Sequence, residues 1–488
     1  MMKKKNLALM LSVAMATIAL SGCGGSGKAK LLDPKKPVTV TVWNYYNGDQ
    51  LTAFEKLVDD FNNTIGAEKG IVVESASQGS VNDLADRLLD SVSGKAGADD
   101  VPSMAAVYAE TAYILDSEEA IVPMDSYFTD EELSEYVPAF IDEGRLKEGG
   151  ELKMFPVSKS TEATVCNITD WKPFEDACGI SVDSIKSYED LAAAAKAYYE
   201  WSDSQTPDVP EDGKALYGRD SISNYIFVGT KQLGHEMFKV DSEGKVAIDM
   251  DRDTFKTLWD NYYIPFINGY YGAFGSYRSE DIKTGSVLAM TGSTSGVSYI
   301  PTQVTKADDT SYDIDIEIHP SLNFASAKEA VAVQQGAGYC IMKTTEAEEF
   351  AAAEFLKWFT DTDQNLNFSI TSGYSPVKTA ANDVAKIEAS FTVDSPKSQN
   401  MLDALLVSAE AYTTGNTYTC KAFAGSKEVR DVLKDALENV SVKDREAVMA
   451  SLAAGTSHED AVKEFSTDEY FDAWFKDLCS QVEATVSK

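Results

Sequence analysis

Short alternating runs of apolar and polar residues recur along the chain and are separated by longer amphipathic segments. Valines alternate with threonines over residues 38–42, which is the period of a β-strand. The next segment carries its apolar residues on one face of a helix: Phe54, Leu57, Val58 and Phe61. Residues 71–73 are apolar and β-branched and predict a second strand. A strand–helix–strand unit of this kind is typical of a mostly parallel sheet.

The same patterns continue toward the C-terminus. Residues 82–89 predict a helix, and the last hundred residues are mainly helical in pattern. Further strands are predicted at residues 104–107, 313–318 and 338–342. Thr345 and Glu348 form a capping box, and the helix that they open is expected to bury Ala352, Phe355, Leu356 and Phe359. Residues 201–216 contain two prolines and a glycine and predict a polar loop.

The N-terminus has the composition of an export signal. Lysines form a cationic head, an apolar stretch runs over residues 7–20, and small residues precede Cys23. We therefore expect a lipoprotein signal peptide over residues 1–22. Cys23 would carry a lipid at the outer face of the cell membrane, and residues 23–36 would form a flexible tether. The alternative is an ordinary signal peptide or membrane helix, although the apolar stretch is short for a span of roughly 20 residues.

Length and charge narrow the classes of protein that remain. A chain of 488 residues exceeds what one hydrophobic core usually serves, so two lobes are expected. The formal net charge of −35 argues against nucleic acid as a partner, because phosphate backbones require clustered lysine and arginine. Five cysteines follow Cys23 without CxxC spacing, which indicates buried thiols rather than zinc or redox chemistry.

No catalytic or metal motif is complete. Residues 235–239 begin like HExxH, but Lys239 stands where the second histidine would be. The aspartates of residues 249–253 have the spacing of a calcium loop, yet the turn glycine is missing, which leaves a helix N-terminus as the alternative. We expect no enzyme activity, no catalytic residue and no cofactor. A secreted carbohydrate-active enzyme or adhesin remains the alternative class.

Aromatic and small hydroxyl residues cluster where predicted strands end. These clusters lie at residues 43–46, 75–80, 158–162, 292–296, 334–338 and 372–376. Ligands of open α/β sheets sit at the carboxyl ends of strands. Aromatic faces with neutral donors and acceptors suit a polyhydroxylated ligand, because the apolar faces of sugars stack and their hydroxyls form hydrogen bonds. Each cluster alone is also compatible with a plain turn.

At this point the chain resembles the family 1 extracellular solute-binding proteins of bacterial ABC importers. The resemblance covers nearly the whole chain after Cys23, and it rests on the order and spacing of several segments rather than on one motif. These segments are residues 42–46, 61–64, 155–162, 167–171, 283–285, 290–296, 334–338, 355–360 and 373–377.

The resemblance implies an α/β, two-lobed periplasmic-binding-protein-like fold of type II, with mixed, mostly parallel sheets flanked by helices. The chain would cross between the lobes near residues 155–158, 313–319 and 377–381. The N-terminal lobe would comprise residues 37–155 and 318–377, and the C-terminal lobe residues 156–317 and 378–488. Hinge closure around the ligand would present a surface to the membrane permease.

Ligand identity follows less directly from the resemblance. Relatives bind maltose-type sugars or glycerol-3-phosphate, and a phosphate requires arginine, lysine or a helix N-terminus. The arginine that the resemblance places on the phosphate falls near Ala422 or Phe423, and Lys421 is one position away. We therefore expect a neutral carbohydrate, with glycerol-3-phosphate or another polyol phosphate as the alternative. The partners are a sugar or polyol and the ABC permease, and we expect a monomer.

The expected ligand-binding residues combine the strand-end clusters with the resemblance. They are Tyr45, Tyr46, Gln78, Ser160, Thr161, Glu162, Ser293, Ser295, Gln335, Gly336 and Tyr374. Tyr374 would form a stacking or hydroxyl-donating wall. Strand alternation lets only one of Tyr45 and Tyr46 face the ligand. Glu162 would accept hydrogen bonds from the two hydroxyls of a diol, or it would be a carboxylate at the surface. Gln78 stands where the family pattern leads us to expect a tyrosine.

Overall fold

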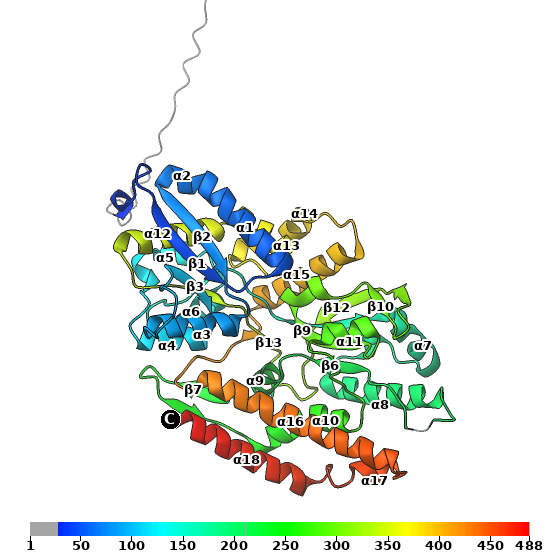
Figure 1. Cartoon of the computed structure of the whole chain (residues 1–488). Helices are drawn as coiled ribbons and strands as arrows, with labels where there is room; N and C mark the ends of the chain where they lie inside the picture. The colour runs from blue at the N-terminus through cyan, green and yellow to red at the C-terminus, as the bar shows by residue number, and fades with distance from the viewer. Residues whose placement is uncertain (1–27, 210, 488) are drawn as a thin grey trace, which may run out of the picture.

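Two separate β-sheets divide the chain into two α/β lobes, which lie one above the other in Figure 1. The computed structural model describes residues 28–209 and 211–487, so the expected signal peptide and Cys23 lie outside the described residues. The strand order is β2-β1-β3-β14-β4 in the first sheet and β12-β5-β9-β6 in the second. The two-lobed α/β class expected from the sequence is confirmed. The sheets are mixed rather than mostly parallel, because antiparallel strand pairs outnumber parallel pairs in these two sheets.

The first lobe surrounds the five-stranded sheet. Its strands are β1 (Val38–Asn44), β2 (Ile71–Ser77), β3 (Met104–Val107), β4 (Phe155–Pro156) and β14 (Gly338–Ile341). Its helices are α1 (Gly48–Asn63), α2 (Ile65–Lys69), α3 (Val81–Val92), α4 (Ala109–Ser117), α5 (Asp130–Leu133), α6 (Pro138–Gly144), α12 (Glu346–Phe359) and α13 (Thr362–Ser372). β1 runs parallel to β2 and β3, whereas β14 is antiparallel to β3 and β4.

Strand alternation explains how helices cover both faces of this sheet. Val40 and Val42 of β1 point into the core formed with α1, α12 and α13, whereas Trp43 points to the opposite core, which α3 and α4 close. The predicted apolar face of α1 is buried, as is the predicted face of α12, whose capping box forms between Thr345 and Glu348.

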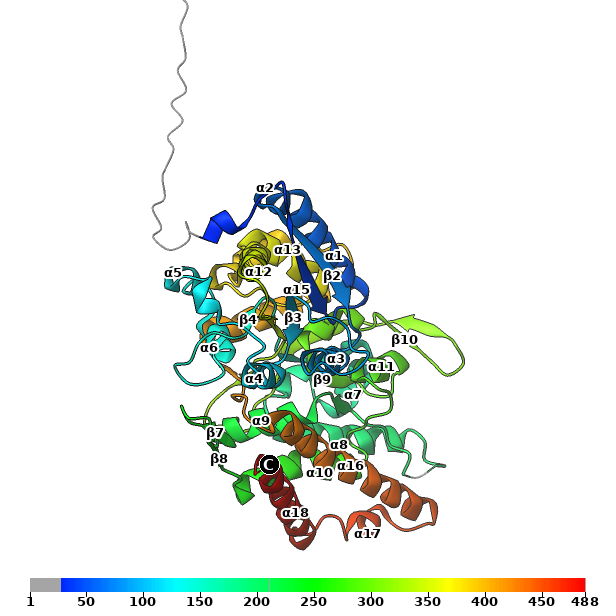
Figure 2. The ribbon, with the colours of Figure 1, turned by 60° about the vertical axis from the view of Figure 1, so that its left-hand side comes forward.

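The second lobe is built on the four-stranded sheet. The strands of that sheet are β5 (Glu162–Asn167), β6 (Tyr217–Arg219), β9 (Ala289–Ser293) and β12 (Ile316–Pro320). Smaller strand pairs are β7 (Phe238–Val240) with β8 (Val246–Ile248), β10 (Gln303–Thr305) with β11 (Ser311–Asp313), and β13 (Ala332–Val333) with β15 (Thr417–Tyr418). The helices are α7 (Ile168–Cys178), α8 (Tyr188–Ser204), α9 (Ile222–Gln232), α10 (Arg252–Ile267), α11 (Arg278–Thr284), α16 (Ser426–Ala453), α17 (His458–Val462) and α18 (Asp468–Val486). The β10–β11 hairpin projects from the side of this lobe in Figure 2.

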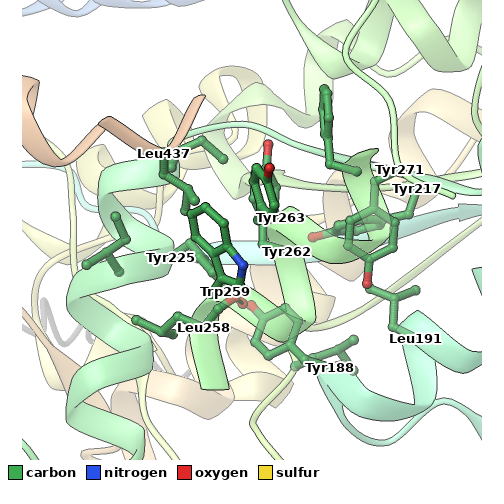
Figure 3. Close-up of a cluster of buried hydrophobic side chains, with 14 of the residues drawn as sticks. Tyr188, Leu191, Tyr217, Tyr225, Leu258, Trp259, Tyr262, Tyr263, Tyr271 and Leu437 are labelled. Carbon is green, nitrogen blue, oxygen red and sulfur yellow. Dashed lines mark hydrogen bonds between the residues drawn. The ribbon is translucent and has the colours of Figure 1, made fainter. Parts of the chain in front are cut away.

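Aromatic residues dominate the core of the second lobe. Figure 3 shows the rings of Tyr188, Tyr217, Tyr225, Trp259 and Tyr263 gathered between the sheet and its helices. Aromatic side chains bury large apolar areas, and this core holds α8, α9, α10 and α16 in place. The sheet of the second lobe therefore rests on a large aromatic core.

Two sequence predictions in the second lobe are wrong in detail. The alternating run at residues 313–318 is split: β11 ends at Asp313, and β12 begins only at Ile316. Ile314 lies between the two strands because its backbone N–H donates to the carbonyl of Thr302 at 3.0 Å and its side chain is buried. The loop predicted at residues 201–216 also begins later, because α8 continues to Ser204.

Three stretches carry the chain between the lobes, two of them short. The first follows β4 and leads into β5. Because β12 still pairs with β5, with Ile318 opposite Val165, we place the second crossing at residues 334–337, immediately before β14, rather than at 313–319. The third begins after α13 and continues through α14 (Val384–Ser390) and α15 (Pro396–Thr414). Along α15, Met401 packs against the second lobe, whereas Tyr412 packs in the core of the first.

The described chain contains five 3-10 helices, of which η4 (Thr294–Tyr299) follows β9 directly. The others are η1 (Lys28–Leu31), η2 (Met124–Ser126), η3 (Val182–Ser184) and η5 (Thr379–Ala381). η4 brings its serine and tyrosine side chains to the space between the lobes.

Candidate functional site

A cavity of about 890 Å³ lies between the two lobes. The first lobe contributes Tyr45, Gln50, Ser80 and Tyr108 to its wall. The second lobe contributes Glu162, Arg219, Asp220, Ser293, Ser295, Tyr277 and Tyr299, and the crossings contribute Gln335 and Tyr374. Six of the residues predicted from the sequence are therefore brought together: Tyr45, Glu162, Ser293, Ser295, Gln335 and Tyr374.

Two tyrosines form the wall of the cavity on the side of the first lobe. Tyr45 follows β1, and its hydroxyl lies 3.1 Å from the hydroxyl of Tyr374, which follows α13. Burial raises the pKa of Tyr374 to about 12 and also raises the pKa of Tyr45. Both hydroxyls are therefore neutral at physiological pH, and each is able to donate as well as accept a hydrogen bond.

Tyr46 points away from the cavity, as strand alternation requires once Tyr45 faces it. Its ring centroid lies 5.1 Å from that of Phe54 and 5.3 Å from that of Phe368, in the core of the first lobe. The side chain is 1% exposed. Tyr46 therefore holds the strand end in place and does not line the cavity.

Serine hydroxyls line the opposite wall. Ser293, at the end of β9, donates a hydrogen bond to the hydroxyl of Ser160 at 3.2 Å and lies 2.9 Å from that of Ser295. Ser160 is buried behind Ser293, so it does not line the cavity. Thr161 is fully buried, and its carbonyl accepts the backbone N–H of Thr294 at 2.9 Å. Ser160 and Thr161 thus support the wall from behind.

Glu162 lines the cavity, but its carboxylate already has partners. It forms a buried ion pair with Arg219 and accepts a hydrogen bond from the side-chain amide of Asn224 at 2.9 Å. Arg219, at the end of β6, was missed in the sequence because its strand is only three residues long. The pair holds the cavity wall together and leaves Glu162 fewer free positions for ligand hydroxyls than expected.

The crossing segments meet directly beside the cavity. Ser160 and Gln335 exchange backbone hydrogen bonds at 2.9 and 3.0 Å, and Lys159 and Ser375 do so at 3.1 and 2.7 Å. All three crossings are therefore joined along Lys159 and Ser160.

Gly336 belongs to this junction rather than to the cavity wall. Its φ of +105° is reached easily by glycine, and its carbonyl accepts a hydrogen bond from the ammonium of Lys159 at 2.7 Å. The Lys159 ammonium also pairs with Glu143 of α6 at 2.7 Å. Gln335 lines the cavity, although its amide group donates to the carbonyl of Thr161 and accepts from Asn224.

Gln78 lies outside the cavity wall. Its side-chain oxygen accepts a hydrogen bond from Arg87 at 3.0 Å, and its backbone N–H donates to the carbonyl of Asn44 at 2.8 Å. The first lobe presents Ser80 and Tyr108 to the cavity instead.

Contacts that span the cleft were also missed in the sequence. The hydroxyl of Tyr299 donates to the side-chain oxygen of Asn47 at 2.7 Å, and the amide of Gln50 donates to the carbonyl of Ser295 at 3.3 Å. Tyr277 and Tyr299 are 66% and 53% exposed and lie at the cavity. Asn47 directly follows the cluster at residues 43–46, which was the sequence signal for this side of the cleft.

Most cations at the cavity are matched by acids. Arg219 pairs with Glu162, Arg278 with Asp281, and Lys434 lies 3.9 Å from Glu438. Lys283 also lines the cavity, but it is exposed.

The segment expected to supply a phosphate ligand does not reach the cavity. Ala422 and Phe423 are buried, and the ammonium of Lys421 lies 2.7 Å from Asp142. At residues 249–253, Asp251 caps α10 by accepting the backbone N–H of Thr254 at 2.8 Å, which is the helix N-terminus interpretation of that spacing.

Residues 56–394 match the family described as bacterial extracellular solute-binding protein. The chain belongs to this family. No curated protein matches its sequence. In the described part of this solute-binding protein, no helix has both the length and the apolar content that a membrane crossing needs. Family membership places the protein among exported proteins.

Several solved structures share the fold of this solute-binding protein at low sequence identity. UgpB from Mycobacterium tuberculosis, in complex with glycerophosphocholine, is 15% identical with a TM-score of 0.65, over 92% of this chain and 98% of that chain. The cyclic α-maltosyl-1,6-maltose binding protein from Arthrobacter globiformis is 18% identical with a TM-score of 0.61, over 90% and 100%. An ABC substrate-binding protein from Listeria monocytogenes in complex with cycloalternan is 14% identical with a TM-score of 0.63, over 91% and 99%.

Proposed function

We propose that this solute-binding protein captures a neutral carbohydrate of oligosaccharide size in the interlobe cavity and delivers it to the permease of an ABC importer. The observation that carries this proposal is a cavity whose walls combine neutral tyrosine hydroxyls from one side with serine hydroxyls from the other. Tyr45 and Tyr374 follow elements of the first lobe, whereas Ser293 and Ser295 lie at the end of β9 and in η4 of the second. Closure of the lobes would then surround the solute with donors and acceptors.

The size of the cavity supports an oligosaccharide. About 890 Å³ lies near the upper end of the roughly 300–1,000 Å³ of typical ligand pockets. The exposed rings of Tyr277 and Tyr299 extend the aromatic surface toward solvent, where further sugar units would stack. Solved proteins of the same fold include binders of cyclic α-maltosyl-1,6-maltose and cycloalternan, which is consistent with this size class.

The charge pattern supports a neutral ligand over glycerol-3-phosphate. A phosphate dianion requires unpaired cations or a helix N-terminus. Arg219 and Arg278 are buried in ion pairs, whereas Lys283 is exposed. Binding a phosphate beside either arginine would require separating a buried pair, which is costly.

Export and anchoring complete the proposal. Cys23 would carry the lipid that holds the protein at the outer face of the cell membrane. The expected tether of residues 23–36 is shortened at its C-terminal end, because Lys28 donates a hydrogen bond to the carbonyl of Ser126 and Leu32 packs against the core of the first lobe. The family consists of binding proteins, which agrees with capture and release of an unchanged solute.

The test is a thermal-shift screen followed by titration calorimetry. The panel contains glucose, maltose, maltotriose, longer linear and cyclic oligosaccharides, glycerol-3-phosphate and glycerophosphocholine. The expected result is saturable binding of a neutral oligosaccharide, recovered unchanged after incubation. Binding of a phosphate compound alone would contradict the neutral ligand, and product formation would contradict solute binding.

A further inference from the structure

The first two turns of α16 face the first lobe across the cleft. The ammonium of Lys427 lies 3.3 Å from the carboxylate of Asp86 in α3, and the guanidinium of Arg430 lies 3.6 Å from that of Glu110 in α4. Lys427 and Arg430 are one helical turn apart, so they share a face of α16. In a chain with a formal net charge of −35, this face brings two cations against two acids of the other lobe.

Arg430 differs from Lys427 because it is also held within its own lobe. Its guanidinium donates a hydrogen bond to the side-chain oxygen of Asn224 in α9 at 2.7 Å and lies 5.3 Å from the ring centroid of Phe227. The guanidinium is planar and carries several donors, so one group contacts the carboxylate of Glu110 and the amide of Asn224 together. Arg430 therefore connects the two lobes.

Asn224 connects Arg430 to the cavity wall through hydrogen bonds. Its side chain is 2% exposed, and its nitrogen donates to the carboxylate of Glu162 and to the side-chain oxygen of Gln335, each at 2.9 Å. The nitrogen faces these two acceptors only while the oxygen of the same amide faces Arg430. A reversed amide would bring its oxygen against the Glu162 carboxylate.

We propose that Arg430 is a positioning residue that couples closure of the lobes to the geometry of the cavity wall. In the closed arrangement its guanidinium bridges Glu110 and Asn224, and Asn224 in turn fixes Glu162 and Gln335. When the lobes separate, Glu110 moves away, and Arg430 loses one of the two groups that fix its guanidinium, so the guanidinium holds the Asn224 amide less firmly. The functional role of closure rests on the proposed solute binding. The contacts of Arg430 with Glu110 and Asn224 are testable without a solute.

The experiment uses the mature chain without added sugar. Small-angle X-ray scattering measures the radius of gyration at about 20 mM and 500 mM NaCl, and hydrogen exchange measures protection over residues 221–226 and 334–337. Because salt screens partly exposed charges, the wild-type protein is expected to expand at high salt. Arg430→Met is expected to be expanded at both salt concentrations and to exchange faster in both segments.

Three further variants separate the two halves of the bridge. Glu110→Gln is expected to expand the protein and to speed exchange over residues 221–226 by less than Arg430→Met does, because Arg430 keeps its hydrogen bond to Asn224. Arg430→Lys keeps the charge but not the planar fork, so it should stay compact and exchange faster at residues 221–226. Lys443→Met, an exposed position on the same helix, is the matched control and should resemble wild type.

Each result of these measurements either supports or rejects the role proposed for Arg430. If Arg430→Met keeps the wild-type radius of gyration and its salt dependence, Arg430 does not couple the lobes. If Arg430→Met expands the protein without changing exchange at residues 221–226 and 334–337, the residue is a simple latch and the positioning role is rejected. Failure of every carbohydrate in the thermal-shift panel would reject the proposed function and leave these scattering results standing.

Discussion

The ammonium of Lys159 lies 2.7 Å from the carboxylate of Glu143, and both side chains are almost fully buried where the crossings meet. Glu143 also accepts a hydrogen bond from the amide of Gln334, and Lys159 donates to the carbonyl of Gly336. One ion pair thus connects α6 of the first lobe to two of the three crossings.

Lys159→Met is expected to destabilise the protein strongly. Removing the cation leaves the carboxylate of Glu143 buried without its partner, which typically costs about 3–5 kcal/mol. Urea unfolding followed by circular dichroism measures the loss. Lys172→Met is the control, because Lys172 and Asp176 form an exposed pair that is screened by solvent and contributes little to stability. Equal losses of unfolding free energy in the two variants would mean that burial of the Lys159–Glu143 pair does not increase the cost of removing its cation.

Gly336→Ala is expected to strain the second crossing. The φ of +105° is unfavourable for alanine, and a Cβ there would approach the carbonyl oxygen of Ser158 to 3.0 Å and the Cα of Lys159 to 3.1 Å. Strain of this kind costs about 1–3 kcal/mol in the free energy of unfolding. Gly296→Ala has open space around the new methyl group and should change stability by less than about 0.5 kcal/mol. If Gly336→Ala left the free energy of unfolding unchanged, the junction would have adjusted to the added methyl group without strain.

Tyr374 is expected to contribute to affinity through both its ring and its hydroxyl. Tyr374→Phe removes the hydroxyl paired with Tyr45 and should weaken binding by about 2- to 10-fold, the value of one hydrogen bond. Tyr374→Ala also removes the ring and should weaken binding further. Titration calorimetry with the sugar identified in the screen measures both. Wild-type affinity in Tyr374→Ala would remove this residue from the site.

The high pKa of Tyr374 predicts a loss of stability in alkali. Burial raises this pKa to about 12 in the folded protein, against 10.0 for the free side chain. The folded state therefore holds the proton between these values, and the contribution to stability is complete below pH 10 and is lost as the pH rises toward 12. Two pKa units correspond to about 2–3 kcal/mol.

Comparison with Tyr374→Phe isolates this contribution. The difference in unfolding free energy between wild type and variant should shrink from pH 9 to pH 11, measured by urea unfolding at each pH. Between pH 6 and pH 9 the affinity for a neutral sugar should stay flat with respect to this group. A difference that grows with pH would contradict the burial of the hydroxyl.

The first lobe was predictable from local pattern. The alternation at residues 38–42 and the helical face of Phe54 and Leu57 describe elements that are buried on a defined side, and both formed as expected. The split of residues 313–318 was not predictable, because Ile314 is buried by a long-range packing contact rather than by strand pairing. The period of the apolar residues alone does not distinguish burial by strand pairing from burial by long-range packing.

The site was predictable only where residues follow strands directly. Tyr45 and Ser293 come at strand ends and reach the cavity. Glu162 was found, but its partner Arg219 lies 57 positions away, and no local spacing links them. Gly336 and Ser160 lie in the segments that resemble the family, yet they form the junction of the crossings and do not line the cavity. A motif gives a residue's position along the chain but not the direction in which its groups point.

The place of β14 in the first sheet also sets the order in which the protein can fold. This strand lies between β3 and β4, yet it is made only after the whole segment from Glu162 to Val333 has been synthesised. Until residues 338–341 emerge, β3 and β4 have no common neighbour, and the lobe lacks α12 and α13 as well. Contacts of such long sequence separation slow folding, because the intervening chain must be ordered before they form. A chain stopped before β14 would therefore carry an open sheet edge at β3, and its unpaired backbone groups would favour association with other chains.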